Sequence, residues 1–231
     1  MKIVKTYSFK KGEEFLKKNH PRELQEILDA IEDLDATSCL TKESQEKTMK
    51  GRLLFSPSDL NNKLKTVYHK KGWTKAANAG KKKIYSEPRH AFGGGRFREM
   101  DGIKNKVGLE VQFGKYAFMG YDIFSKMVIF RNLKYIDCGV EIVAGQELVK
   151  QMSTGVSSFD QLLIDFEHRG EADIDCPVFV IGIGLTDEEK ENAQKLTKLF
   201  KTDKEKALRT IGILKSYSGT LPGPKKEVSD L

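Results

Sequence analysis

The residues best suited to chemistry in this chain are two carboxylates and an amide: Asp101, Glu110 and Gln112. The segment that holds the last two alternates between polar and apolar side chains, a period that is typical of a half-buried strand. Glu110 and Gln112 are then expected to point away from the core, on one side of that strand. Gly and Asn within residues 102–106 indicate a turn, and a hairpin there would bring Asp101 beside Glu110.

Carboxylates that are held together repel each other unless a cation neutralises them. Magnesium suits such a place, because it binds one or two carboxylates together with water and substrate phosphate. A metal held in this way can activate water for the cleavage of a phosphodiester. The spacing alone also fits an ordinary hairpin whose acids are solvated on its outer face, so the pattern leaves both interpretations open.

Positive charge is concentrated just before this segment. The whole chain of 231 residues has a formal net charge of +7, but residues 63–98 hold eleven Lys or Arg and a single acid. That segment alone carries +10, and the remainder is slightly acidic. A concentrated basic segment favours a polyanion such as nucleic acid, although a solvated surface loop would have the same composition.

Composition excludes several other classes of protein. Hydrophobic residues make up 39% and charged residues 32%, which is typical of a globular chain rather than a disordered one. The longest apolar run, residues 178–185, is too short to span a membrane, and the first residues show no secretory signal. The three Cys form no C-x-x-C pair, so neither a zinc site nor a disulfide framework is expected. Buried free thiols in a reducing cytoplasm are the simple interpretation.

Helical and strand periods alternate along the chain, which predicts a mixed α/β sandwich in one domain over residues 1–218. Helices are expected at 13–18, 22–34, 41–50, 59–68, 116–133, 146–152, 158–167 and 186–217, the last region holding two helices. Strands are expected at 3–7, 109–113, 135–143 and 177–183.

Two segments lack a sustained period. Residues 74–98 are rich in Lys, Ala, Asn and Gly and predict a mobile basic loop that becomes ordered on a partner. The tail, 219–231, is expected to be disordered. The helix over 116–133 is apolar on much of its circumference, so it is expected to be buried or to pack against a second subunit.

Around these acids the sequence resembles the PD-(D/E)xK nucleases, and in particular the BamHI/BglII branch of type II restriction endonucleases, most closely its BstYI-type members. The run Glu-Val-Gln-Phe-Gly-Lys-Tyr at residues 110–116 resembles the active-site strand of that branch. Similar stretches lie at 41–44, 46–48, 121–122, 139–142 and 152–155, and the resemblance covers roughly residues 1–184. It implies a restriction-endonuclease core, a central mixed β-sheet flanked by helices, to which residues 186–217 add a C-terminal helical extension.

The resemblance also implies a homodimer that cuts double-stranded DNA at a short palindrome containing GATC and leaves 5′ overhangs. Asp101, Glu110 and the backbone carbonyl of Val111 would bind Mg²⁺, with Mn²⁺ as a substitute and no organic cofactor. Gln112 stands where most of the superfamily has lysine. Because an amide is neither a base nor a cation, Gln112 could only orient the attacking water or a metal-bound water.

DNA contacts are expected from two groups of residues. Lys115 and the Ser153-Thr154 pair fall where the family reads base edges, and Lys or hydroxyl side chains suit such contacts. Lys115 could instead contact a phosphate, which positions the protein without specifying sequence. The basic segment contributes five further candidates: Lys81, Lys82, Lys83, Arg96 and Arg98.

The first hypothesis is therefore a type II endonuclease of a prokaryotic cytoplasm, with DNA and a second copy of the chain as its partners and no membrane association. Two alternatives stay open. A structure-selective repair or resolving nuclease would use the same metal site but ignore sequence. A non-enzymatic DNA-binding protein would rely on its basic segment for salt-dependent affinity.

Overall fold

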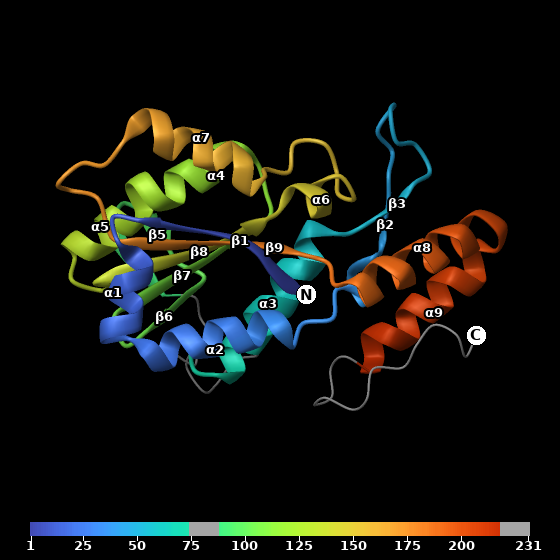
Figure 1. Cartoon of the computed structure of the whole chain (residues 1–231), viewed down its shortest axis with the longest axis horizontal. Helices are drawn as coiled ribbons and strands as arrows, with labels where there is room; N and C mark the ends of the chain where they lie inside the picture. The colour runs from blue at the N-terminus through green and yellow to red at the C-terminus, as the bar shows by residue number, and fades with distance from the viewer. Residues whose placement is uncertain (74–87, 218–231) are drawn as a thin grey trace.

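A five-stranded mixed sheet forms the centre of the computed structural model, which describes residues 1–73 and 88–217 (Figure 1). Its strand order is β1-β9-β8-β7-β6. β7, β8 and β9 run parallel to one another, and β1 and β6 pair antiparallel at the two edges. The strands are β1 (Lys2–Phe9), β6 (Gly102–Lys104), β7 (Val107–Gln112), β8 (Cys138–Ala144) and β9 (Val178–Gly184).

Helices cover both faces of this sheet and create two apolar cores (Figure 1). One face is covered by α1 (Gly12–Asn19), α2 (Pro21–Glu32) and α3 (Pro57–Lys70). The other face is covered by α4 (Tyr116–Tyr121), the π-helical turn η2 (Asp122–Lys126), α5 (Met127–Asn132) and α7 (Phe159–Arg169). The short segments η1 (Thr37–Cys39) and α6 (Gln146–Val149) complete the body. The mixed α/β sandwich predicted from the sequence is confirmed.

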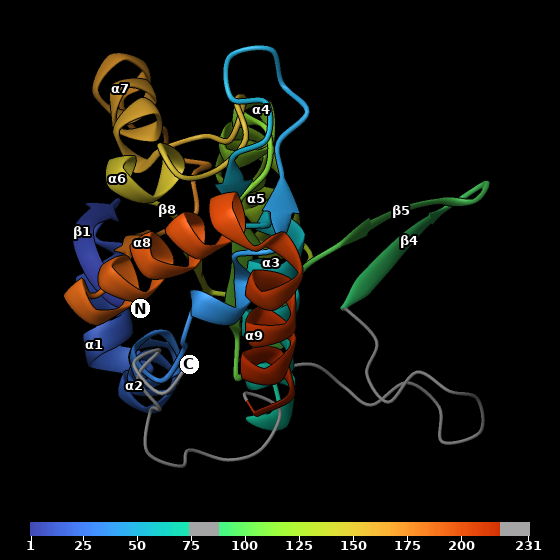
Figure 2. The same ribbon diagram turned by 90° about the vertical axis from the view of Figure 1, so that its right-hand side faces the viewer.

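The C-terminal helices α8 (Asp187–Thr202) and α9 (Lys204–Tyr217) pack against each other and against η1 at one end of the molecule (Figure 1). Figure 2 shows this end from the front. α8 begins with a capping box, in which Thr186 and Glu189 bond each other's backbone N–H. Glu189 also accepts hydrogen bonds from the Met1 amino group at 3.0 Å and from Ala36 N at 2.7 Å. One buried carboxylate thus joins the C-terminal helices to the beginning of the chain.

Two of the expected elements are wrong. Residues 41–50 form no helix but belong to a small ribbon of β2 (Lys42–Glu43) and β3 (Leu53–Leu54), because this segment lacks an apolar helical face and Gly51, at φ 76°, closes a turn. Residues 88–98 are not an irregular loop. They form a hairpin of β4 (Arg89–Gly93) and β5 (Arg96–Glu99), and all three glycines of the turn have positive φ.

Three further expectations concern the basic segment with the tail, the cysteines and membrane-spanning helices. Residues 74–87, with Lys81, Lys82 and Lys83, and the tail 219–231 lie outside the described residues. Cys39, Cys138 and Cys176 are free and buried, as expected. Within residues 1–73 and 88–217, no helix is both long and apolar enough to cross a membrane.

β7 differs from the half-buried strand that its alternation predicts. Leu109 and Val111 pack into the core beneath α1–α3, as expected, but Glu110 is also buried, with an exposed fraction of 3%. The polar side of β7 therefore faces the α4–η2–α5 helix rather than solvent. This difference decides the electrostatics of the site.

Candidate active site

A two-residue turn brings Asp101 against β7. Asn105 and Lys106 both have positive φ, 45° and 69°, as the tight turns of β-hairpins require, and the resulting register pairs Gly102 with Leu109. Asp101 Oδ2 accepts a hydrogen bond from Val111 N at 2.9 Å. The structure thus brings together the Asp101 and Glu110 carboxylates, whose charges interact.

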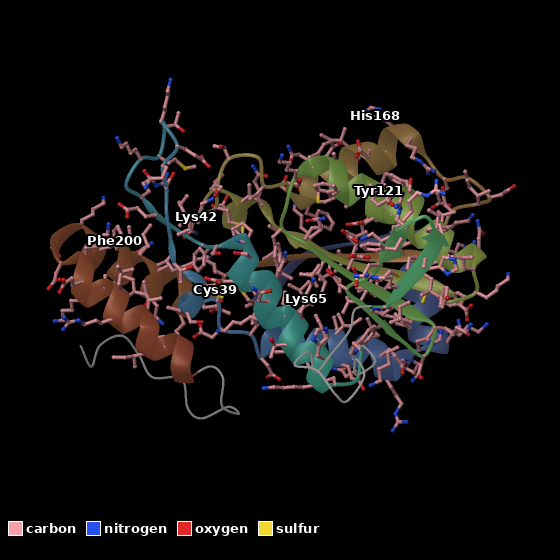
Figure 3. All side chains as sticks on the ribbon, turned by 180° about the vertical axis from the view of Figure 1, so that it is seen from behind. Cys39, Lys42, Lys65, Tyr121, His168 and Phe200 are labelled. Carbon is pink, nitrogen blue, oxygen red and sulfur yellow. The ribbon has the colours of Figure 1, made fainter. Side chains whose placement is uncertain are left out.

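A lysine from each face of the sheet reaches this pair of acids. Lys65, labelled on α3 in Figure 3, lies 2.8 Å from Asp101 Oδ1. Lys126, from η2, lies 2.8 Å from Glu110 Oε1 and 2.6 Å from Asp122 Oδ1. Each carboxylate that was expected from the sequence therefore has its own ammonium counter-ion.

Gln112 is fixed by two hydrogen bonds. Its Nε2 donates to Asp122 Oδ2 at 3.2 Å, and its Oε1 accepts from Gly114 N at 2.9 Å. Gln112, Asp122, Lys126 and Glu110 thus form a continuous polar chain along the helix-facing side of β7. The amide orients its neighbours and keeps a second N–H for water.

Glu141 is a further acid at this site. It lies opposite Glu110 in the parallel register of β7 and β8, so both side chains point to the same face of the sheet. Glu141 is fully buried, and among the described residues neither of its carboxylate oxygens has a hydrogen-bond partner. Buried polar groups are nearly always bonded, so an orphaned carboxylate is unusual.

Burial and like charge shift the titration of these acids. Burial, with the nearby Asp101 charge, raises the pKa of Glu110 well above its usual range, and Lys126 opposes this only in part. Burial next to Asp122 and Glu110 raises the pKa of Glu141 in the same way. The pKa of Asp122 is also raised, chiefly by burial. The pKa of Lys126 is raised because the carboxylates around it outweigh its desolvation.

These residues suit a hard divalent cation. Within residues 1–73 and 88–217, no three His, Cys, Asp or Glu side chains form a preformed metal cage. Magnesium needs less than such a cage, since one or two carboxylates with water and phosphate are enough. Asp101 and Glu110 supply these oxygens, and the orphaned Glu141 places a further carboxyl group beside them. The donor set therefore fits a magnesium site that is completed by substrate.

Four residues of the site were missed from the sequence: Lys65, Asp122, Lys126 and Glu141. Asp122 and Lys126 lie in a segment whose apolar residues dominated the interpretation, and Glu141 lies in a strand that alternates like any other. The i, i+4 spacing of Asp122 and Lys126 is visible in the sequence. Only the fold shows that Lys126 contacts Glu110, that Glu141 lies opposite Glu110, and that Lys65 contacts Asp101.

The residues expected to read bases lie in neighbouring loops. Lys115 is exposed just before α4 and forms a β-bridge with Val156, two residues beyond Thr154. Ser153 Oγ accepts from Lys42 Nζ, and Thr154 Oγ1 donates to Glu46 Oε2 at 2.8 Å. Both hydroxyls are therefore bonded to the β2–β3 region, which was absent from the sequence-based site.

The β4–β5 hairpin carries the other described DNA-contact candidates, Arg96 and Arg98. Figure 2 shows it as an arm that leaves the body of the molecule. Both side chains are exposed, and the Arg98 guanidinium lies 5.8 Å from the ring of Tyr121, a residue labelled in Figure 3. Phe92 and Phe97 add exposed aromatic surface to the same arm.

This fold is shared with a solved structure described as the restriction endonuclease BglII complexed with a DNA 16-mer. The similarity has a TM-score of 0.62 at 18% sequence identity, and it covers 80% of this chain and 79% of that one. The fold is therefore that of a restriction endonuclease.

The sequence gives the family. The model of the family described as restriction endonuclease BglII/BglIII matches residues 4–183, and the chain belongs to this family. It is a type II restriction endonuclease, an enzyme that hydrolyses DNA. No curated protein sequence matches the chain. Helices α8 and α9 lie beyond the matched residues.

Proposed function

We propose that this enzyme is a magnesium-dependent endonuclease that cuts both strands of a short palindrome containing GATC, as a symmetric dimer, and leaves 5′ overhangs. Within its family it is of the BstYI type, with residues 1–218 as one endonuclease domain, and it acts in a prokaryotic cytoplasm. The observation that carries the proposal is that Asp101, just before β6, bonds to Val111 N and so lies next to Glu110 on β7, inside a chain of this family.

Asp101, Glu110 and the Val111 carbonyl would hold the cation, which when bound supplies a Lewis acid and a water of lowered pKa. The chain's own residues do the positioning. Val111 N fixes Asp101 through a hydrogen bond of 2.9 Å, and Lys126 fixes Glu110 at 2.8 Å. Gln112, which is held by Asp122 and Gly114, directs its remaining N–H to the attacking water.

DNA would lie across the surface that carries Lys115 and the Ser153-Thr154 loop. The Lys115–Val156 bridge keeps these two segments together, so both can reach the same groove. The β4–β5 arm would contribute phosphate contacts from Arg96 and Arg98. The solved BglII structure is a DNA complex, which supports a DNA-binding surface in this fold.

The dimer would form on the outer surface of α4 and α7. Phe118 on α4 and Ile164 on α7 are each 53% exposed, and Tyr116 beside them is 40% exposed. Tyr116 donates to Asp165 Oδ1 at 2.5 Å and so joins the two helices into one surface. A palindromic DNA site has two-fold symmetry, so it is best bound by a symmetric dimer. The exposed apolar side chains on α4 and α7 are the reason for placing the interface here.

Digestion of unmethylated phage DNA tests the activity. In Mg²⁺ the enzyme is expected to give discrete fragments, and sequencing their ends should show GATC within a single palindrome and a 5′ overhang. Fragments with random ends would favour the structure-selective nuclease. The variant Glu110→Ala is the control: it should bind DNA without cutting it, and unchanged cleavage would refute the site.

Sedimentation of Phe118→Asp tests the dimer. Self-association should weaken at least about tenfold, because a charge would be buried in the interface. Leu208→Asp on α9 is the matched control, since Leu208 is similarly exposed at 43% but lies away from α4 and α7. A Phe118→Asp protein that dimerises like the wild type would place the interface elsewhere.

A further inference from the structure

The ammonium group of Lys126 occupies the middle of the acid site. It lies 2.8 Å from Glu110 and 2.6 Å from Asp122, and the side chains of the three residues are 13%, 4% and 3% exposed, respectively. Glu110 is also a proposed metal ligand. One buried carboxylate is thus in contact with a lysine and is also needed for a divalent cation.

The π-helical turn explains how the lysine reaches this position. The helix over residues 116–132 is interrupted by η2, from which Asp122 and Lys126 meet each other and the sheet. π-Turns are rare and occur frequently at functional sites. Gly139 on β8 allows the helix to lie close, because a Cβ at that position would clash with Met127 Sδ.

The charges at this site are unequal in number. Four carboxylates, those of Asp101, Glu110, Asp122 and Glu141, surround the ammonium groups of Lys65 and Lys126. The carboxyl groups thus outnumber the ammonium groups by two, and one divalent cation supplies the two positive charges that would balance their ionised forms. The buried and unbonded carboxylate of Glu141 is an independent sign that the site takes a further cation.

We propose that Lys126 is a tethered counter-ion that competes with the divalent cation. Its ammonium group holds Glu110 and Asp122 in place while no metal is bound, and it leaves Glu110 when the metal arrives. Lys126 is therefore a positioning residue that sets the affinity of the site for metal. This inference rests on the proposed function, in which Glu110 is a metal ligand.

Calorimetric titration of the DNA-free protein with Mn²⁺ tests the competition. Lys126→Met removes the ammonium group and keeps a chain of similar length, so Mn²⁺ should bind at least about tenfold more tightly than to the wild type. Lys104→Met is the matched control, because Lys104 forms a comparable half-buried ion pair with Glu26 at 2.7 Å outside the acid site. Equal or weaker Mn²⁺ binding by a folded Lys126→Met protein would overturn the proposal.

A second measurement uses the unaltered chain and holds even if Lys126→Met does not fold. Lysines of the wild type are acetylated with an N-hydroxysuccinimide ester, with and without Mn²⁺, and are quantified by mass spectrometry. Lys126 should react several-fold faster when Mn²⁺ is bound, whereas Lys104 should not change. An unchanged or slower reaction at Lys126 would overturn the displacement.

The two proposals fail in different ways. If the wild type binds no Mn²⁺ and also fails to cut DNA in Mg²⁺ or Mn²⁺, the metal-dependent activity proposed above is refuted. If Mn²⁺ binds and the Lys126 measurements show no competition, only the tethered counter-ion is refuted.

Discussion

The carboxylates of the acid site are wholly or partly buried, and all of them except Glu141 contact a lysine. Arg96 and Arg98 of the β4–β5 arm are instead exposed, on a ribbon that leaves the body of the molecule. Glu110 is 3% exposed and contacts Lys126, and Asp101 is held by Val111 and Lys65. Arg96 and Arg98 have no carboxylate partner among the described residues. Both regions were predicted from the sequence: the acid site at residues 101–112, and the arm as part of the basic segment at residues 63–98.

The difference shows two uses of charge in one enzyme. At the acid site the fold has already removed the carboxylates from water, so their positions are fixed before substrate arrives. On the arm the charged side chains are still solvated. They contribute favourable free energy only when a polyanion binds and counter-ions are released. Substitutions in the first region should therefore affect catalysis and stability, and substitutions in the second should affect binding.

The strongest test of this contrast is Asp101→Asn. The amide can still accept the Val111 N–H, but it loses the negative charge that a divalent cation needs. We expect DNA cleavage in Mg²⁺ to fall by at least about 1,000-fold, which corresponds to roughly 4 kcal/mol in the barrier, while DNA affinity in a gel-shift assay stays close to that of the wild type. Asp187→Asn, at an exposed acid of α8, should cut normally. Full activity of Asp101→Asn would show that the acid site is not catalytic.

The variant Glu141→Gln tests the cost of burying a carboxylate at the acid site, through the pH dependence of folding stability. Because the folded protein raises the pKa of Glu141, native Glu141 keeps its proton at a pH where the unfolded chain has lost it, so its contribution to stability falls as pH rises above the unfolded value. The variant lacks this titration. We expect it to be more stable than the wild type at pH 8 by about 1–3 kcal/mol in the absence of metal, with little difference near pH 4.

Thermal melts at several pH values measure this gain. The exposed variant Glu147→Gln serves as the control and should melt like the wild type at every pH. A Glu141→Gln protein that is less stable at pH 8 than at pH 4, relative to the wild type, would show that Glu141 forms a stabilising ion pair instead.

The smallest expected effect comes from the arm. Arg96→Ala combined with Arg98→Ala should reduce the slope of log K against log salt by about 2, because two phosphate contacts are lost. The rate of cleavage at saturating DNA and the recognised sequence should not change. Arg209→Ala on α9 is the control, since Arg209 is exposed but lies in the C-terminal extension. A slower reaction at saturating DNA would show that the arm takes part in catalysis.

Local patterns determined most of the elements. Ser56 and Pro57 indicate the beginning of α3, and Ser56 Oγ indeed accepts from Asp59 N. The capping box at Thr186 predicts α8, and the alternation at 109–113 predicts β7. These signals are reliable because each depends on neighbours within one helical turn or one strand. The predictions for residues 41–50 and 88–98 were wrong because a short β-ribbon forms through its pairing partner, and the local period of the sequence does not show that partner.

The sequence by itself determined that Asp101 and Glu110 can meet, since a two-residue turn separates their strands. It also determined the resemblance to the family, which the match over residues 4–183 confirms. Only the tertiary structure decided that Glu110 is buried, that Lys65 and Lys126 neutralise the acids, and that Glu141 lies beside Glu110. These groups come from four separate elements. The desolvation of a charged side chain depends on which distant elements pack against it, and the local pattern of the sequence does not specify that packing.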